Sequence, residues 1–194
     1  MVIVKKYRVL ISCPGDVYNK FEEEIIEAIN DVNYHLGKLS THGDNGVCHK
    51  VEIEPVYWGK DSVAEYSIGQ DAQEVLNGQL IDDTLDGTIG IFYRRLGTPT
   101  ARYDSGTIEE IEMSAKHGKY TAMLTINPFE NNSIPQSCLP EYMRLYNYVE
   151  EYKNSKKGLY SSPDPSCLKK SIMDICYAII LHDGYLLNSA VDKM

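Results

Sequence analysis

The stretch YRVLISCPGDV, residues 7–17, contains the change of pattern that decides the fold. Its first seven residues are mostly apolar and rich in strand-forming side chains, which is typical of a buried strand, and Pro14-Gly15 then marks a loop. From Asp16 to Gly37 the apolar residues follow helical spacing, at Ile25, Ile29, Val32 and Leu36. The stretch therefore predicts a buried strand that leads directly into a long helix.

The alternation of strand and helix continues as far as residue 126. The sequence predicts further strands and helices at 50–58, 71–83, 87–93, 105–119 and 120–126, in the order strand, helix, strand, helix, strand. Strands that alternate with helices form βαβ units. We therefore expect an α/β protein with a mostly parallel central sheet that helices cover on both faces.

The pattern changes after Asn127. A polar loop is followed by a tyrosine-rich helix near 140–156, a connector KKGLYSSPDPS, and a last helix near 166–189. Tyrosines at spacings of four in the first of these helices predict aromatic packing. We expect residues 127–194 to be a mostly helical part that completes the cover of the sheet, so that residues 1–194 form one domain.

Composition limits the classes of partner. The net charge of −9 argues against DNA or RNA, because phosphate binding needs clustered Lys and Arg. Five scattered cysteines and the lack of a signal layout or a long apolar segment predict a reduced, cytoplasmic protein without a membrane helix. The spacing of His42, Cys48 and His49 matches no standard zinc site, and neither a P-loop nor a GxGxxG motif is present. We expect no metal and no bound cofactor.

In open parallel sheets, ligands bind beyond the carboxyl ends of the strands. The loops expected there hold an unusual density of aromatic and charged groups: Ser12, Asp16, Trp58, Asp61, Arg94, Arg95 and Asp104. Trp58, the single tryptophan, is a candidate to stack on a base or a nicotinamide ring. The alternative is that polar loops collect such residues without a function.

The helix SGTIEEIEMSAKHGK, residues 105–119, carries three glutamates. Thr107 and Glu110 fit a capping box, in which Glu110 bonds the Thr107 amide. Glu109 is expected to face solvent, and Glu112 to pair with Lys116 beside an apolar stripe of Ile108, Ile111 and Ala115. On residue chemistry alone, Glu110 remains either a helix cap or a reagent.

The blocks YRVLISCPGDV, PVYWGKDS, GTIGIFYRRLGTPT and DSGTIEEIEMSAKHGK, in this order, resemble a TIR-like domain over residues 6–126. The likeness is to bacterial members, and more distantly to nucleoside 2-deoxyribosyltransferases. It implies a flavodoxin-like three-layer sandwich with the strand at 7–13 between those near 50–57 and 87–93. It also implies cleavage of an N-glycosidic bond, with NAD as a substrate rather than a cofactor, and a role as an antiviral defence effector.

The family's catalytic glutamate is followed by an aliphatic residue at the next position and a small one four positions on, as Glu110 is by Ile111 and Ser114. The transferases carry an aspartate six residues earlier, which here is Asp104. The resemblance thus implies Glu110 as nucleophile or charge stabiliser and Asp104 as orienting or acid group. By the same matching, Ser12 and Asp16 lie in the loop that lines the family's pocket. Together with the residues of the other loops at the strand ends, they are the candidate substrate contacts, with Arg94 or Arg95 on a phosphate: Ser12, Asp16, Trp58, Asp61, Arg94 and Arg95.

Several alternatives stay open at this point. The WC-type signature of many TIR domains is replaced by DSGT before Glu110, so nucleosides and other nucleotides remain candidate substrates beside NAD. A deoxyribosyltransferase-like enzyme is one alternative. A non-catalytic module that only self-associates or docks a partner is another. Such domains commonly form homo-oligomers and stand beside, or are activated by, a sensor domain or protein, and we expect the same here.

Overall fold

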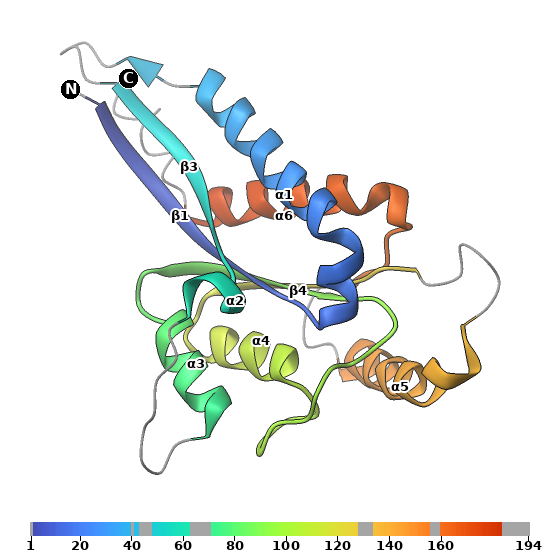
Figure 1. Cartoon of the computed structure of the whole chain (residues 1–194). Helices are drawn as coiled ribbons and strands as arrows, with labels where there is room; N and C mark the ends of the chain where they lie inside the picture. The colour runs from blue at the N-terminus through green and yellow to red at the C-terminus, as the bar shows by residue number, and fades with distance from the viewer. Residues whose placement is uncertain are drawn as a thin grey trace.

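The computed structural model describes residues 2–39, 41–42, 48–62, 71–127, 134–155 and 160–183. The strands are β1 (Val2–Ser12), β2 (Thr41–His42), β3 (Cys48–Val56), β4 (Leu85–Phe92), β5 (Tyr120–Thr125) and β6 (Tyr160–Ser161). The helices are α1 (Gly15–Lys38), α2 (Trp58–Asp61), α3 (Ala72–Leu80), α4 (Gly106–Lys116), α5 (Leu139–Ser155) and α6 (Leu168–Asp183). Two 3-10 turns, η2 (Gln136–Cys138) and η3 (Pro165–Cys167), precede the last two helices. Figure 1 shows α1 and α6 on one face of the sheet and α3, α4 and α5 on the other.

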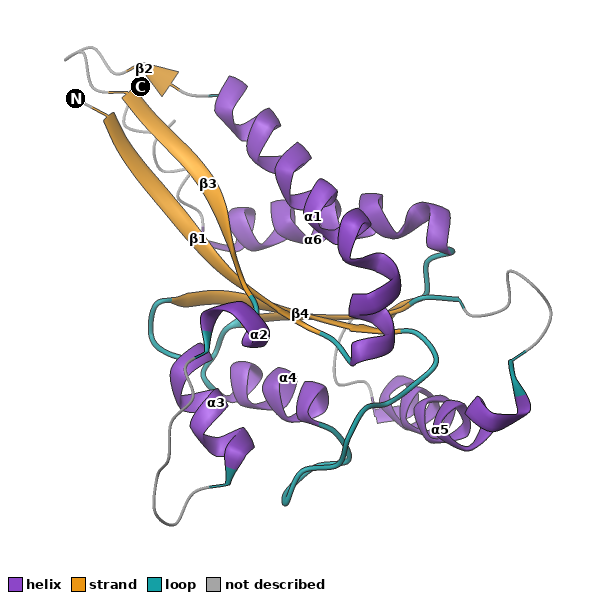
Figure 2. Ribbon diagram, viewed as in Figure 1, coloured by secondary structure: helices purple, strands orange, loops and turns teal. Residues whose placement is uncertain are grey.

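The strands form one sheet in the order β2-β3-β1-β4-β5-β6. Five of them are parallel, and only the short edge strand β2 runs antiparallel, against β3. The prediction that the first strand lies between the strands near 50–57 and 87–93 is confirmed. The order of the parallel strands and the helices on both faces (Figure 2) make this a flavodoxin-like three-layer α/β fold.

Strand β1 is buried on both faces where it reaches the carboxyl edge of the sheet. Successive side chains of a strand point to opposite faces. Val9 and Ile11 accordingly belong to the core cluster that includes α1 and α6, whereas Leu10 packs with Leu80 and Leu85 on the other side. The run of apolar residues in β1 is therefore what a strand covered twice requires.

Helix α4 lies close against β4, and this contact positions the glutamates of the sequence analysis. A Cβ on Gly90 of β4 would lie 2.1 Å from Cδ1 of Ile111, so only glycine admits the helix at this distance. Thr88 and Ser114 join the two elements through a buried hydrogen bond of 2.7 Å between their hydroxyls. The expected apolar stripe is correct for Ile108 and Ile111 but wrong for Ala115, which is exposed.

The C-terminal part contributes to both faces and to the sheet. Helix α6 packs against α1, and α5 packs against β4 through a cluster that contains Leu145, Val149 and Phe92. Tyr148 and Tyr152 join that cluster, as the predicted aromatic packing requires. The stretch KKGLYSSPDPS, predicted as a connector, also holds β6, which pairs with β5 and was not predicted.

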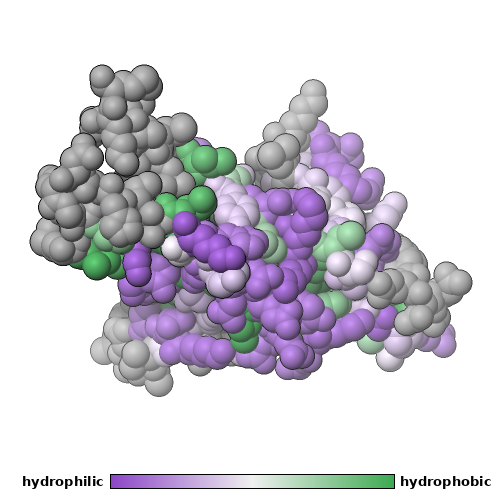
Figure 3. All heavy atoms as spheres, turned by 90° about the horizontal axis from the view of Figure 1, so that it is seen from above, coloured by the Kyte–Doolittle hydropathy of each residue, from purple (hydrophilic) through white to green (hydrophobic). Residues whose placement is uncertain are grey.

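The described residues seen from above in Figure 3 are mostly hydrophilic, with scattered hydrophobic spots. Exposed large hydrophobic side chains include Val2, Ile3 and Val4 of β1. None of the helices described is long and apolar enough to cross a membrane.

Candidate functional site

The start of α4 differs from the predicted capping box. Ser105 is the N-cap, because its hydroxyl accepts a hydrogen bond of 3.2 Å from the backbone N–H of Ile108. Thr107 lies inside the helix, so the pairing of Thr107 with Glu110 as a cap is wrong. The side chain of Glu110 has other partners.

Glu110 is 5% exposed and points to the carboxyl end of β1. The hydroxyl of Ser12, the last residue of β1, donates to Oε2 of Glu110. Nε2 of Gln73, on α3, donates to Oε1 at 2.9 Å. Elements far apart in the sequence thus hold both oxygens of one buried carboxylate.

Glu110 reaches a cavity of about 300 Å³ at the carboxyl edge of the sheet. Its walls come from the loops after β1 and β4, from α3 and from the first turn of α4: Cys13, Pro14, Gly15, Gln73, Leu76, Arg95, Gly97, Thr98, Gly106, Thr107 and Glu110. Gly97 has a φ of 104°, in the left-handed region that glycine favours, and so turns the loop at the cavity wall. This volume is at the lower end of the range for small-molecule sites.

Burial sets the electrostatics of the cavity. It raises the pKa of Glu110 above its ordinary value, because a desolvated carboxylate is disfavoured. The charge of Glu109 raises this pKa further, whereas the hydrogen bonds from Ser12 and Gln73 lower it. Burial, with the charges of Glu110 and Asp16, also raises the pKa of the Cys13 thiol to about 12. Cys13 is therefore no thiolate nucleophile at neutral pH, and Glu110 is the one acidic side chain among the described residues that line the cavity.

A second hollow of about 380 Å³ adjoins the first and shares Cys13 and Gly15 with it. Its remaining walls are the apolar or aromatic side chains of Ile11, Tyr18 and Tyr57, together with Asn19 and Lys60. The hydroxyl of Tyr57 is buried and has no hydrogen-bond partner among the described residues. The two hollows together form an extended surface around the start of α1.

The two predicted arginines lie differently. Arg95 is exposed and lines the cavity with Glu110. Arg94 is half-buried, with its guanidinium carbon 4.7 Å from the ring centre of Tyr93, and is not a lining residue.

The predicted acidic residues of the rim lie outside the cavity. Oδ2 of Asp16 accepts from the backbone N–H of Arg94 at 3.0 Å, so Asp16 fixes the loop after β4. Asp61, the last residue of the short helix α2, accepts a hydrogen bond of 2.6 Å from the backbone N–H of Tyr57, the residue before the helix. Asp104 is exposed and lines a different hollow, together with Glu112 and Tyr148. The side chain of Trp58 lies outside the described part of the chain, so its predicted stacking role stays a prediction.

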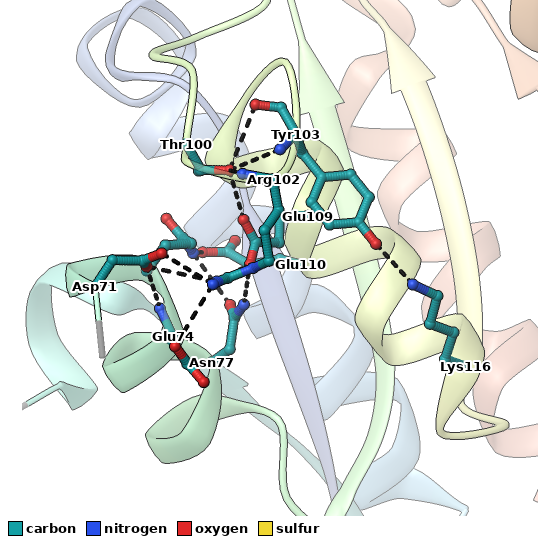
Figure 4. Close-up of polar contacts among 10 residues, drawn as sticks. Asp71, Glu74, Asn77, Thr100, Arg102, Tyr103, Glu109, Glu110 and Lys116 are labelled. Atoms are coloured by element: carbon teal, nitrogen blue, oxygen red, sulfur yellow. Dashed lines mark hydrogen bonds and ion pairs between the residues drawn. The ribbon is translucent and has the colours of Figure 1, made fainter. Parts of the chain in front are cut away.

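Glu109, predicted to face solvent, is fully buried, and that prediction is wrong. Its carboxylate accepts from Nε of Arg102 at 2.9 Å, from Thr100 at 2.6 Å and from Asn77 at 3.0 Å, and it also pairs with Nη2 of Arg102. Arg102 continues to Asp71 at 2.9 Å, so the network ties α3 and the loop before α4 together (Figure 4). No local sequence pattern predicts these contacts, because the partners of Glu109 come from two other segments, residues 71–77 and 100–102.

No family model matches the chain, and no curated protein is similar to it. Solved structures with a similar arrangement include oxidised flavodoxin 1 from Bacillus cereus, with 12% identity and a TM-score of 0.38 over 92% of this chain and 99% of that chain. Translation elongation factor SelB from Methanococcus maripaludis has 8% identity and a TM-score of 0.41 over 92% of this chain and 36% of its own. Era in complex with MgGDPNP and ribosomal RNA has 13% identity and a TM-score of 0.33 over 84% of this chain and 51% of its own. At these identities the likeness concerns the fold and not the activity.

Proposed function

We propose that this chain is a TIR-like N-glycosidase that cleaves the bond between ribose C1′ and a base nitrogen, with NAD or a related nucleotide as substrate. The observation that carries the proposal is the placement of Glu110. Its carboxylate is buried at a cavity on the ligand-binding edge of the sheet, and Ser12 and Gln73 hold it instead of a helix cap. The family resemblance around Glu110 supports the same residue independently.

The chemistry needs one negative charge under the sugar. When the C1′–N bond breaks, its electron pair leaves with the nitrogen and positive charge develops on the ribose. The ionised Glu110 stabilises that charge or captures C1′ as an ester, and water then supplies the oxygen at C1′ and releases a proton. Burial strengthens this effect, because the same low polarity that raises the pKa of Glu110 leaves its charge poorly screened.

The position of Asp104 favours NAD over purine nucleosides within this proposal. A purine leaving group usually needs a proton from an acid, whereas nicotinamide leaves as a neutral molecule. Asp104, the acid expected from the resemblance, lines another hollow, and Glu110 is the sole acidic lining residue among those described. We assign Arg95 to a substrate phosphate and the Tyr18–Tyr57 hollow to the remainder of the nucleotide.

The test is a substrate panel of NAD, nucleosides and nucleotides, incubated with the protein at high concentration and read as free nicotinamide or free base. It is run with and without forced clustering of the protein, since the resemblance supports a homo-oligomeric defence effector. Release of nicotinamide from NAD that Glu110→Gln abolishes is expected. No release from any substrate in the clustered protein would leave the non-catalytic TIR-like module as the better proposal.

A further inference from the structure

An unbroken chain of hydrogen bonds leads from the ion pair of Glu109 to the proposed reagent. Nδ2 of Asn77 lies 3.0 Å from Oε1 of Glu109. Oδ1 of the same amide accepts from Nε2 of Gln73 at 3.1 Å, and that nitrogen also donates to Oε1 of Glu110 at 2.9 Å. Among the described residues, no hydrogen bond joins Asn77 to Glu110 directly, and Asn77 links the two neighbouring carboxylates through Gln73.

The charge of Glu109 fixes the direction of this chain. Glu109 is paired with Arg102 and, as a carboxylate, only accepts hydrogen bonds. Asn77 therefore turns its N–H groups toward Glu109 and its carbonyl toward Gln73. That carbonyl in turn requires the N–H groups of Gln73, so Gln73 presents a donor and not an acceptor to Glu110.

Gly106 leaves room for the other end of the Gln73 amide. A Cβ at Gly106, the first residue of α4, would lie 2.6 Å from Oε1 of Gln73. Helix α4 thus carries Glu110 and, at Gly106, the missing side chain that leaves room for the Gln73 amide.

We propose that Asn77 and Gln73 are positioning residues, a relay through which the Glu109–Arg102 pair keeps a hydrogen-bond donor fixed on one oxygen of Glu110. The relay holds the carboxylate in one orientation toward the cavity and stabilises its ionised form. Its effect on turnover rests on the proposed function, whereas its effect on the carboxylate does not.

Other groups around Glu110 also influence its ionisation, and the test has to leave them unchanged. From β1 and the loop after it come Ser12 and Cys13, from the loop after β4 comes Arg95, and from its own helix comes Glu109. Helix α3 contributes Gln73 and Leu76, both uncharged. Substitutions of Gln73 or Asn77 therefore change no formal charge around Glu110.

The test is the titration of Glu110 in the full chain, followed by carboxyl ¹³C NMR on glutamate-labelled protein. The resonance that is absent in Glu110→Gln identifies Glu110. Gln73→Met removes the donor, and Asn77→Leu removes the group that orients it. Both are expected to raise the pKa of Glu110 above the wild-type value, because a donor to the charged form is lost. Gln79→Met, on the same helix but outside the cavity lining, is the control that leaves the titration unchanged.

The result for Asn77 decides between a relay and a simple contact. A shift in Gln73→Met alone, or in neither variant, overturns the relay. If Asn77→Leu does not fold, Asn77→Ala provides the same comparison. With NAD as substrate, both variants are also expected to lower kcat roughly tenfold to a hundredfold with a smaller change in KM, as for a hydrogen bond to a charged group. A wild type without turnover overturns the proposed function, and the titration still decides the relay.

Discussion

Glu110→Gln separates the chemical from the structural role of this residue, because the amide preserves the shape of a buried group. The Gln carbonyl still accepts from Gln73, and its NH₂ group donates to the Ser12 hydroxyl, which has acceptor capacity. What disappears is the negative charge. For a charge aimed at a developing cation, the expected loss of nicotinamide release is on the order of 100- to 1000-fold.

The same substitution is expected to leave the melting temperature unchanged or to raise it at pH 8. The pKa of Glu110 is higher in the folded chain than in the unfolded chain, where it is about 4.3. A raised pKa means that the protonated form stabilises the fold and that this contribution is lost as the pH rises through the folded value. Gln is uncharged at every pH, so its advantage grows from pH 4 to pH 8. Each kcal/mol gained raises the melting temperature by about 2–4 °C in a chain of this size.

The assay pairs differential scanning fluorimetry between pH 4 and pH 8 with chromatographic detection of nicotinamide. Glu112→Gln is the matched control, since Glu112 is half-buried on the same helix and lines another hollow. A Glu110→Gln protein that melts lower than wild type at pH 8, yet turns over normally, would refute the reasoning. Glu110 would then be a structural residue whose charge stabilises the fold.

Three further substitutions test the surroundings of Glu110. Gly106→Ala is expected to reduce turnover about tenfold, because the added methyl group displaces the Gln73 amide. The melting temperature is not expected to fall, because alanine favours the helix by up to about 1 kcal/mol. Unchanged kinetics would contradict the tight fit between Gly106 and Gln73. Glu109→Gln is expected to destabilise the fold by about 1–3 kcal/mol, measured by urea unfolding, because the buried acceptor of Arg102 and its neighbours loses its charge; a stability equal to wild type would show the network to be dispensable. Arg95→Gln is expected to raise KM for NAD severalfold and to leave any turnover of unphosphorylated nucleosides unaffected, as Arg95 is assigned to a phosphate; equal effects on both would remove that assignment.

The fold was predictable from the sequence where a helix or strand is long enough for the spacing of its apolar residues to be recognised. β1 and β4 both end in short, mostly apolar runs, VLIS and TIGIF, and α1 repeats its apolar residues at helical spacing along its 24 residues, so the local sequence is enough to predict each of them. β2 and β6 have two residues each, too few for any period. Their existence depends on a neighbouring strand that offers free backbone groups, as β5 offers Met123 and Leu124 to β6.

The site was predictable in part for a related reason. Of the predicted residues, Arg95 and Glu110 line one cavity, and Ser12 is buried behind Glu110, to which its hydroxyl donates a hydrogen bond. The sequence predicts Glu109 in solvent because an amphipathic pattern assumes that only one face of a helix is covered. The first turn of α4 is instead also covered by α3 and by the loop that carries Arg102, and their side chains bury Glu109.

The two adjacent glutamates show how environment divides roles between identical side chains. Glu109 is fully buried with a guanidinium and neutral donors, an arrangement that satisfies its charge and joins three segments. Glu110 is buried beside it with neutral donors only, and its pKa is raised by burial and by the charge of Glu109. A second carboxylate in this position weakens the fold at neutral pH, where an amide of the same shape would not. A costly charge directed into a cavity is what glycosidic bond cleavage requires, and it has no evident structural use. This asymmetry is the physical reason to look for chemistry at Glu110 rather than at Glu109.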